Sequence, residues 1–552
     1  MKLLSLWVGG AAGEGIQTIG DAVARTFLAH GYPAFATSEF ESRIRGGNSS
    51  VRIRVADEPA NAPSPVADIL LAVNPTALAF YRSALTDGGL SIGPEGSENV
   101  DVAVAFKDLA KESGGTIYAN AVAAGALCAA VGLPMETLNR TLADAFARRG
   151  VEIVRANRAA AQAGFDAAAE QLGDRRPKLI PSRENHYAFA SAHETIPIGA
   201  AAAGCRFMAA YPMSPSTGII TAFAKNPQLG VFTEQAEDEI SAINMVLGAS
   251  AAGARAMTAT SGGGFALMTE GVSLAGMIET PIVIVIAQRP GPATGLPTRT
   301  AQEDLLFALR GGHGEFPRAI LAPSDPQDAM DLTVRAFDLA DRYQVPVIVL
   351  TDQYLADSTF ALPSLDLPPK ISGGVASDES HPNVYQRYRL TEDGISPRLP
   401  LGHPEHLVVL DSDEHTEAGH ITEDLEETRP AMVEKRLEKG RRLKLEMAAP
   451  IANGLEGAKR ILIGWGSTRG AIDETVERLR ANGQAVGSLH FTELWPLPDL
   501  ELPDAEYWVV EGNATGQFAG LLESELGLTI AGRIGRYDGR PIDAEAILEE
   551  LT

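Results

Sequence analysis

Residues 207–265 gather side chains that could bind and activate a small molecule. A run of turn-forming residues, Tyr-Pro-Met-Ser-Pro-Ser-Thr, occupies positions 211–217. Three acids follow at 237–239, and a strand pattern then runs into a small-residue loop, Thr-Ser-Gly-Gly-Gly, at 260–264. A hydroxyl group, a carboxylate and an open backbone in one stretch could hold a polar ligand and exchange a proton with it.

Glu239 is the carboxylate best placed for proton exchange. It falls in the first turn of a predicted helix, because apolar residues recur at helical spacing after it. These residues are Ile240, Ile243, Leu247 and Ala251. Carboxylates in a first turn are also favoured by the helix dipole, so Glu237, Asp238 and Glu239 could be helix-start residues without a chemical role. The pattern alone favours this second explanation.

Two glycine-rich segments could bind an anion. Residues 9–15, Gly-Gly-Ala-Ala-Gly-Glu-Gly, lie between a predicted strand and a predicted helix, where backbone N–H groups could hold a phosphate. Their spacing differs from the dinucleotide-binding fingerprint, so a plain strand-to-helix turn explains them equally well. Residues 42–48, Ser-Arg-Ile-Arg-Gly-Gly-Asn, suit an anion or a solvated hairpin-like loop.

Side chains of the metal-ligating type gather at Asp411, Asp413, His415 and His420. Ligand type alone rarely identifies a metal site, and the acid-rich surroundings favour a solvated loop. We therefore expect no metal site in this chain.

Strand patterns alternate with helix patterns along the chain. This alternation predicts an α/β protein of several domains, each with a parallel sheet between two helical layers that positions these residues. Residues 1–172 and 191–367 form the first two domains, joined by a polar, proline-bearing linker at 173–190. Residues 368–455 are expected to form a connector or arm with a charged helix at 432–447. Residues 456–552 form the last domain.

Composition excludes several classes of function. The chain has 552 residues, a net charge of −25 and 45% apolar residues, so it is globular and repels nucleic-acid phosphates and anionic membranes. It contains no apolar run long enough to span a membrane. The two cysteines, Cys128 and Cys205, can build neither an iron–sulfur site nor a disulfide framework, which fits a reducing, cytoplasmic environment.

In their combined order, the motifs at 211–217, 237–244 and 260–264 resemble the α subunit of 2-oxoacid:ferredoxin oxidoreductases, most closely the 2-oxoglutarate type with a γ domain fused ahead of α. Residues 1–172 resemble the γ domain and 191–367 the domain that binds the pyrimidine of thiamine diphosphate. Residues 456–552 resemble the transketolase C-terminal-like domain. The resemblance implies coenzyme A-dependent oxidative decarboxylation of 2-oxoglutarate to succinyl-CoA and CO₂, with ferredoxin as the electron acceptor. With low-potential ferredoxin, the same reaction could run in reverse as a reductive carboxylation.

The resemblance also assigns roles to residues. Glu239, with Glu237 as runner-up, is expected to protonate the aminopyrimidine ring, and Ser214 and Arg289 are expected to hold the substrate carboxylate. Further expected cofactor contacts are Tyr211, Pro212, Thr260, Ser261 and Gly262. Arg299 is a candidate for the distal carboxylate, and the candidates for coenzyme A are Gly13, Gly15, Arg45, Gly46 and Gly47. One departure stands out, because the family's second domain often opens Gly-Asn-Glu-Ala, whereas this chain reads Ala-His-Glu-Thr at 192–195.

Half of the implied site is absent from the sequence. The chain lacks the Gly-Asp-Gly and downstream Asn-Asn that hold Mg²⁺ and the diphosphate in thiamine enzymes, and it lacks a cysteine set for a cluster. The resemblance therefore implies a β subunit that supplies Mg²⁺, diphosphate contacts and a [4Fe–4S] cluster. The implied assembly is (αβ)₂, alone or with further electron-transfer subunits, and the isolated chain is expected to be inactive.

Three alternatives stay open at this point. The first is the same reaction on a branched-chain 2-oxo acid, pyruvate or indolepyruvate. The second is a non-catalytic scaffold or regulatory subunit, which intact Ser214, Glu239 and Arg289 disfavour. The third is a nicotinamide dehydrogenase, which the absence of Gly-x-Gly-x-x-Gly disfavours.

Overall fold

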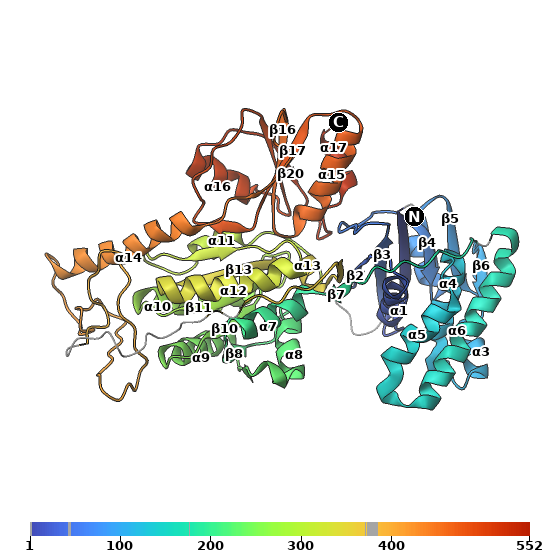
Figure 1. Ribbon diagram of the computed structural model, residues 1–552, viewed down its shortest axis with the longest axis horizontal. Coiled ribbons are helices and arrows are strands. Elements are labelled where there is room, and N and C mark those ends of the chain that lie inside the picture. Colours follow the sequence, from blue (N-terminus) through green and yellow to red (C-terminus); the bar gives the residue numbers. More distant parts are fainter. Residues whose placement is uncertain (1–2, 42–45, 176, 370, 372–384, 552) are drawn as a thin grey trace.

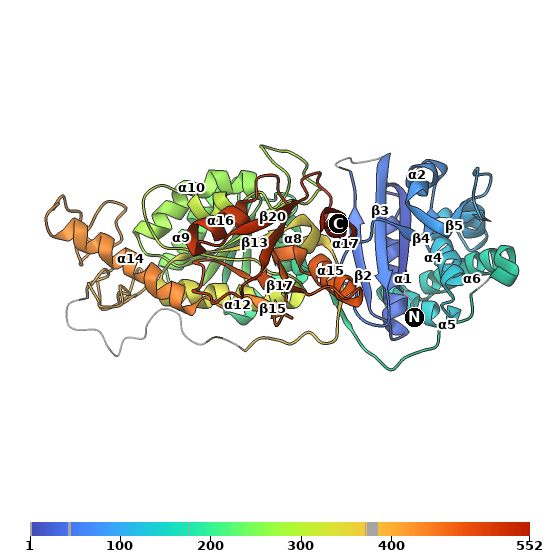
Figure 2. The same cartoon turned by 90° about the horizontal axis from the view of Figure 1, so that it is seen from above.

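The chain folds into three α/β bodies (Figure 1). The computed structural model describes residues 3–41, 46–175, 177–369, 371 and 385–551. The N-terminal body lies at one end of the molecule, and the central and C-terminal bodies pack against each other beside it (Figures 1 and 2). The predicted α/β multidomain class is confirmed.

The described residues of the N-terminal body form a six-stranded sheet in the order β2-β3-β1-β4-β5-β6. The strands are β1 (Leu4–Ala12), β2 (Ala34–Glu39), β3 (Gly46–Val55), β4 (Ala67–Ala72), β5 (Leu85–Pro94) and β6 (Val102–Val104). Strands β1, β4, β5 and β6 are parallel, but β3 pairs antiparallel with both β1 and β2. The expectation of a wholly parallel sheet is wrong here, because β2 and β3 are joined by a short connection and a parallel return needs a long crossover.

Helices cover both faces of this sheet. They are α1 (Ile16–Ala29), α2 (Pro75–Tyr81), α3 (Phe106–Glu112), α4 (Ala119–Val131), α5 (Met135–Phe146) and α6 (Val151–Leu172). Leu6 and Val8 of β1 join the apolar cluster of α1, α4 and α6, whereas Trp7 points the other way and packs with Leu78 and Tyr81 of α2. This alternation gives the predicted three-layer arrangement.

The central body is built on a sheet whose described order is β18-β12-β13-β11-β10-β8-β9. Its strands are β8 (Phe207–Ala210), β9 (Phe232–Gln235), β10 (Ala256–Thr260), β11 (Ile282–Gln288), β12 (Ala319–Leu321), β13 (Pro346–Asp352) and β18 (Glu493–Trp495). Strand β18 comes from the C-terminal part of the chain and pairs antiparallel with β12, whereas the other neighbours are parallel. The last domain therefore extends the central sheet, which sequence patterns did not predict.

The helices of the central body are α7 (Ala192–Ala202), α8 (Thr217–Lys225), α9 (Glu239–Ala251), α10 (Gly262–Met277), α11 (Leu305–Arg310), α12 (Pro326–Tyr343) and α13 (Gln353–Asp357). Val283 and Val285 of β11 belong to the cluster formed with α7 and α12, whereas Ile284 and Ile286 belong to the cluster formed with α9 and α10. Both faces of the strand are buried, which explains why its sequence is apolar without alternation.

The C-terminal body contains a sheet in the described order β15-β17-β16-β19-β20, parallel except for β15. Its strands are β15 (Ile451–Asn453), β16 (Arg460–Trp465), β17 (Val486–Phe491), β19 (Glu506–Glu511) and β20 (Ile530–Gly535). Its helices are α15 (Arg469–Ala481), α16 (Gln517–Leu526) and α17 (Ala544–Leu551).

The predicted charged helix of the connector is α14 (Thr428–Glu446), which packs on the central body. Lys435 Nζ lies 2.5 Å and Lys439 Nζ 2.7 Å from the carboxylate oxygens of Glu279, and all three side chains are buried. Burial acts to raise the pKa of Glu279, but the two ammonium groups hold it well below its usual value. The connector is thus anchored by a buried charge cluster. A short pair, β7 (Ala188–Ala190) with β14 (Phe360–Leu362), ties the end of the linker to the central body.

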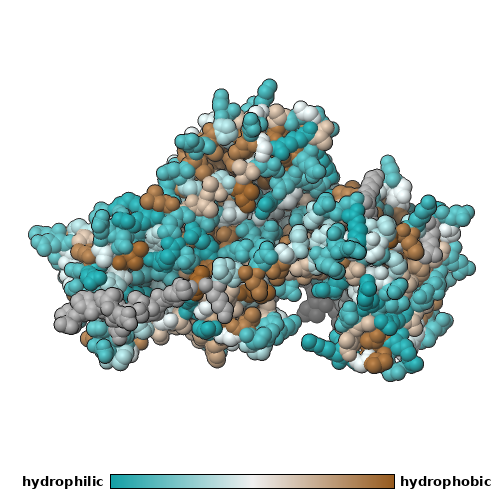
Figure 3. Space-filling model, in the orientation of Figure 1, coloured by the Kyte–Doolittle hydropathy of each residue, from teal (hydrophilic) through white to brown (hydrophobic). Residues whose placement is uncertain are grey.

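The face drawn in Figure 3 is mostly hydrophilic, with scattered apolar residues. No helix among the described residues is both long and apolar enough to cross a membrane.

Candidate active site

The turn at residues 211–216 connects the C-terminal end of β8 to α8. Ser216 Oγ donates to the Met213 carbonyl at 2.7 Å, and Arg289 Nη1 donates to the Ser214 carbonyl at 2.7 Å. Ser214 itself is exposed, so its hydroxyl is available to a ligand. Parallel sheets bind ligands at the C-terminal ends of their strands, and this turn lies at such an end.

Glu239 is the first residue of α9, and its side chain is buried. The helix is capped by Asp238, whose carboxylate accepts from the Ser241 amide at 2.7 Å. Among the described residues, the Glu239 carboxylate has no hydrogen-bond or ion-pair partner. Burying such a carboxylate is unfavourable, so helix capping explains Asp238 but not Glu239. Glu237 precedes the helix and is exposed.

The small residues after β10 begin α10 at Gly262, so the expectation of a loop at 260–264 is wrong. Gly262 and Gly264 must still lack side chains, because other groups occupy the space. A methyl group on Gly264 would lie 2.1 Å from Thr260 Oγ1 and 2.6 Å from Glu239 Oε1. Gly264 therefore lets the Glu239 carboxylate approach α10. The neighbouring Ser261 hydroxyl is buried and has no partner within the described part of the chain.

Arg289 and Asp304 add two charges beside the turn. Arg289 follows the end of β11 and is mostly buried, which lowers the pKa of its guanidinium, while Asp304 opposes this effect. Burial raises the pKa of Asp304 to about 6, Glu303 adds to the rise and Arg289 reduces it. A methyl group on Gly262 would lie 2.4 Å from Asp304 Oδ2, so this carboxylate sits against the start of α10. The structure thus brings Ser214 and Arg289 together, and it adds Asp304, which sequence reasoning missed.

Arg299 lies at the junction with the N-terminal body. Its guanidinium pairs with Glu39 of β2, which also pairs with Arg52 of β3. Although burial acts to raise the pKa of Glu39, Arg52 and Arg299 lower it. The sequence candidate for the distal carboxylate is therefore already ion-paired.

The first glycine loop lines a cavity of about 370 Å³ in the N-terminal body, together with parts of β2 and β3. Gly13 and Gly15 belong to this lining and have positive φ, and Gly15 precedes α1. Gly46 and Gly47 begin β3, also with positive φ, whereas Arg45 lies outside the described residues. A methyl group on Gly15 would lie 1.9 Å from Asn120 Nδ2, so close packing alone already requires glycine there.

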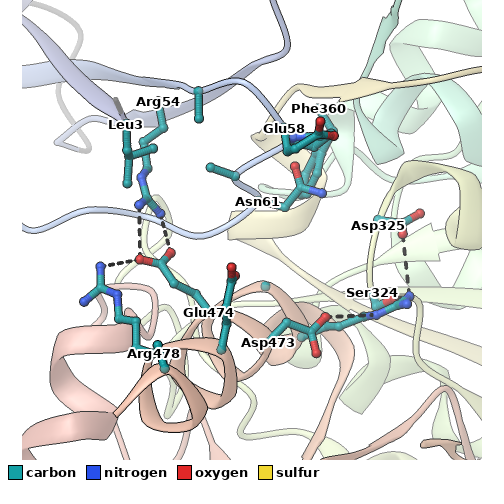
Figure 4. Close-up of a pocket in the computed structure, with 17 residues that line it drawn as sticks. Leu3, Arg54, Glu58, Asn61, Ser324, Asp325, Phe360, Asp473, Glu474 and Arg478 are labelled. Atoms are coloured by element: carbon teal, nitrogen blue, oxygen red, sulfur yellow. Dashed lines mark hydrogen bonds and ion pairs between the residues drawn. The ribbon is translucent and has the colours of Figure 1, made fainter. Parts of the chain in front are cut away.

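A second cavity, of about 590 Å³, lies where the three bodies meet (Figure 4). Arg54 Nη1 donates to Glu474 Oε2 of α15 at 2.7 Å, and Arg478 pairs with the same carboxylate. Asp325 and Asp473 line another side. None of the expected site residues belongs to this lining, so we interpret its ion pairs as contacts that join the bodies.

Residues 511–517, at the C-terminal end of β19, also join the C-terminal body to the central body. The Gln302 amide donates to the Gly512 carbonyl at 2.7 Å, and Gln302 Oε1 accepts from the Gly512 amide at 2.8 Å. Asn513 Nδ2 donates to the Gln302 carbonyl at 2.9 Å. This strand end is therefore used to hold the segment after Arg299 rather than left open for a ligand. No local pattern could have revealed a partner so distant in sequence.

The acid- and histidine-bearing segment near 411–420 forms no metal-binding group in the described part of the chain. His415 is buried against Tyr388, with ring centroids 3.7 Å apart, and its Nδ1 lies 2.9 Å from the Asp413 carbonyl. Burial lowers the pKa of His415. The interpretation of a fully solvated loop is therefore wrong at this residue, which is a packed side chain.

Comparisons with known proteins cover nearly the whole chain. Residues 198–435 match the family described as pyruvate flavodoxin/ferredoxin oxidoreductase, thiamine diphosphate-binding, and residues 5–167 match the family described as pyruvate ferredoxin/flavodoxin oxidoreductase. The chain is 30% identical to 2-oxoacid:ferredoxin oxidoreductase 2, subunit alpha, from Aeropyrum pernix, over 98% of this chain and 96% of that relative. It is 35% identical to the 2-oxoglutarate synthase subunit KorA of Methanothermobacter thermautotrophicus, over 61% of this chain and 93% of that relative. A solved structure, the 2-oxoglutarate:ferredoxin oxidoreductase from Magnetococcus marinus with 2-oxoglutarate, coenzyme A and succinyl-CoA bound, matches with a TM-score of 0.91 and 32% identity, covering 100% of this chain and 99% of that chain.

Proposed function

Because the chain belongs to the family of 2-oxoacid:ferredoxin oxidoreductase α subunits, we propose that it catalyses, with a partner, the coenzyme A-dependent oxidative decarboxylation of 2-oxoglutarate. The products are succinyl-CoA and CO₂, and the two electrons pass singly to ferredoxin. The observation that carries the proposal is the buried Glu239 side chain at the start of α9, whose carboxylate has no partner among the described residues. The names of two relatives, a 2-oxoglutarate synthase subunit and a 2-oxoglutarate-bound oxidoreductase, support this substrate.

The donor set fits the pyrimidine half of thiamine diphosphate. Glu239 can exchange a proton with a ring nitrogen, and Ser261 has a buried hydroxyl to offer. Tyr211, Pro212, Thr260 and Gly262 are the other proposed cofactor contacts. When bound, thiamine diphosphate supplies the nucleophilic carbon and accepts the negative charge left by the loss of CO₂.

We assign the substrate's C1 carboxylate to Ser214 and Arg289. The Ser214 hydroxyl is exposed at the strand end, and Arg289 reaches the backbone of the same residue. A guanidinium with a hydroxyl beside it suits a carboxylate and orients the adjacent keto carbon. Arg299 can bind the distal carboxylate only if the substrate displaces Glu39.

A β subunit completes the proposed site with Mg²⁺, diphosphate contacts and a [4Fe–4S] cluster. The same elements that carry the half-site also expose large apolar side chains. These are Tyr211 in the turn, Ile240 and Met245 on α9, and Leu267 on α10. Exposed apolar groups beside an incomplete site indicate a surface that a partner covers. The assembly we propose is (αβ)₂, with ferredoxin as a transient partner.

The N-terminal body is our candidate for binding coenzyme A, through the loop of Gly13 and Gly15 and through Gly46, Gly47 and Arg45. The first-turn amides of α1 face no intrahelical acceptor, as at any helix start, and suit a phosphate. Against this, the described lining of the cavity includes Glu39 and Glu41, so a phosphate there requires a cation such as Arg45.

The test is reconstitution with the β subunit from the same source. The complex is assayed with 2-oxoglutarate, pyruvate, a branched-chain 2-oxo acid and indolepyruvate, each with coenzyme A and a viologen dye. We expect the highest kcat/KM for 2-oxoglutarate and no turnover by the isolated chain. Turnover by the chain alone would contradict the shared site, and a complex inactive on every 2-oxo acid would favour a scaffold.

A further inference from the structure

Three successive carbonyl groups of the turn that carries Ser214 each accept a hydrogen bond from a side chain, and two of these side chains lie outside the turn. The Met213 carbonyl accepts from Ser216 and the Ser214 carbonyl from Arg289, as described above. The Pro215 carbonyl accepts from Nε2 of His193, at 2.8 Å. His193 comes from α7, an element that contributes no expected site residue.

We infer that His193 is a positioning residue for the substrate carboxylate: by holding the Pro215 carbonyl, it sets the position of the neighbouring Ser214 hydroxyl. This inference rests on the proposed function, because it deepens the role given to Ser214. A carbonyl oxygen can only accept, so Nε2 carries a proton. His193 itself need not touch the substrate.

The imidazole ring is held from two further directions. Its Nδ1 lies 3.4 Å from Oδ1 of Asp357 on α13, and the other carboxylate oxygen of Asp357 accepts from Gln353 Nε2 at 2.8 Å. On another side the ring packs against Gly218 of α8, where a methyl group would lie 2.3 Å from Nδ1 and 2.4 Å from Cγ. The ring therefore has one well-defined position from which to hold the turn.

The hydrogen bond to the Pro215 carbonyl requires a donor as far from the backbone as Nε2 of histidine. The amide nitrogen of glutamine can reach the place of Nε2, whereas that of asparagine reaches only the place of Nδ1. His193→Gln should therefore keep the hydrogen bond to Pro215, and His193→Asn should lose it. A residue needed only for packing would not distinguish the two in this way.

The experiment measures kcat and KM of the reconstituted complex for the 2-oxo acid. For His193→Ala and His193→Asn we expect KM for the 2-oxo acid to rise about tenfold with kcat within about twofold, because an interaction shared by the bound substrate and the transition state is weakened. His193→Gln should restore KM to within about threefold of the wild type. KM for coenzyme A should stay unchanged, and His186→Ala, at an exposed histidine, serves as the matched control.

A second variant tests the same link from the other side. Gly218→Ala should raise KM in the wild type by pushing the ring away, and it should have no further effect in the His193→Ala background, where the ring is gone. Unchanged KM in His193→Ala, or an equal loss with glutamine and asparagine, overturns the inference while the proposed function stands. A wild-type complex that turns over no 2-oxo acid overturns both.

Discussion

Replacing Glu239 with glutamine separates a chemical role from a structural one. Glutamine has nearly the same shape but cannot exchange a proton with a cofactor ring. General acid–base catalysis contributes on the order of 10²–10⁴-fold, so we expect kcat of the reconstituted complex to fall by that factor. The substitution should not destabilise the folded chain.

The expected effect on stability follows from the surroundings of the carboxylate. Glu239 is 5% exposed, and it has no partner within the described residues. Glutamine removes the charge from a buried side chain that has no partner in the described part of the chain, so the thermal midpoint of the chain should stay equal or rise. If Glu239 were only a helix-start acid, its loss would instead cost about 0.3–1 kcal/mol and leave activity intact. The two explanations therefore differ in both measurements: activity falls only if Glu239 has a chemical role, and stability falls only if Glu239 is a helix-start acid.

The assay is viologen reduction by the complex with 2-oxo acid and coenzyme A, together with thermal unfolding of the chain. Glu237→Gln is the matched control, because Glu237 is two residues away and exposed. It should behave as wild type. A Glu239→Gln complex that keeps more than about a tenth of the wild-type kcat would refute the reasoning.

Three further results are expected. Glu279→Gln should destabilise the chain by about 3–5 kcal/mol in denaturant unfolding, because it leaves Lys435 and Lys439 buried without a counter-charge. An unchanged denaturant concentration at the unfolding midpoint would contradict this. Since burial raises the pKa of Asp304 to about 6, the folded chain binds this proton more tightly than the unfolded chain. The free energy of unfolding should then fall by up to about 3 kcal/mol as pH rises from about 4 to about 6, and Asp304→Asn should abolish that decline in denaturant titrations at each pH. Arg299→Gln should raise the ratio of KM for 2-oxoglutarate to KM for pyruvate about tenfold. Glu39→Gln, which releases Arg299 from its ion pair, should lower this ratio. Equal changes in KM for both substrates would show that Arg299 does not bind the substrate.

Local patterns were sufficient for much of this protein. Helical spacing after Glu239 predicted α9 and put the carboxylate in its first turn, and the apolar runs of β11 and β13, which lack alternation, are typical of central parallel strands. The order of short motifs indicated the family, and the missing diphosphate motif indicated an incomplete site. These features are all properties of residues that are near one another in the chain.

Only the tertiary structure decided which distant groups meet. It buried the Glu239 side chain and left its carboxylate without a partner in the described residues. It brought His193 to the Pro215 carbonyl and paired Arg299 with Glu39, a contact across 260 positions of sequence. Periodicity reports which face of an element is buried but carries no information about its partner, because pairing depends on how whole sheets and bodies pack. The thiamine half-site that we propose around Glu239 could therefore be proposed from the sequence, whereas the side chains that hold the turn of Ser214 could not.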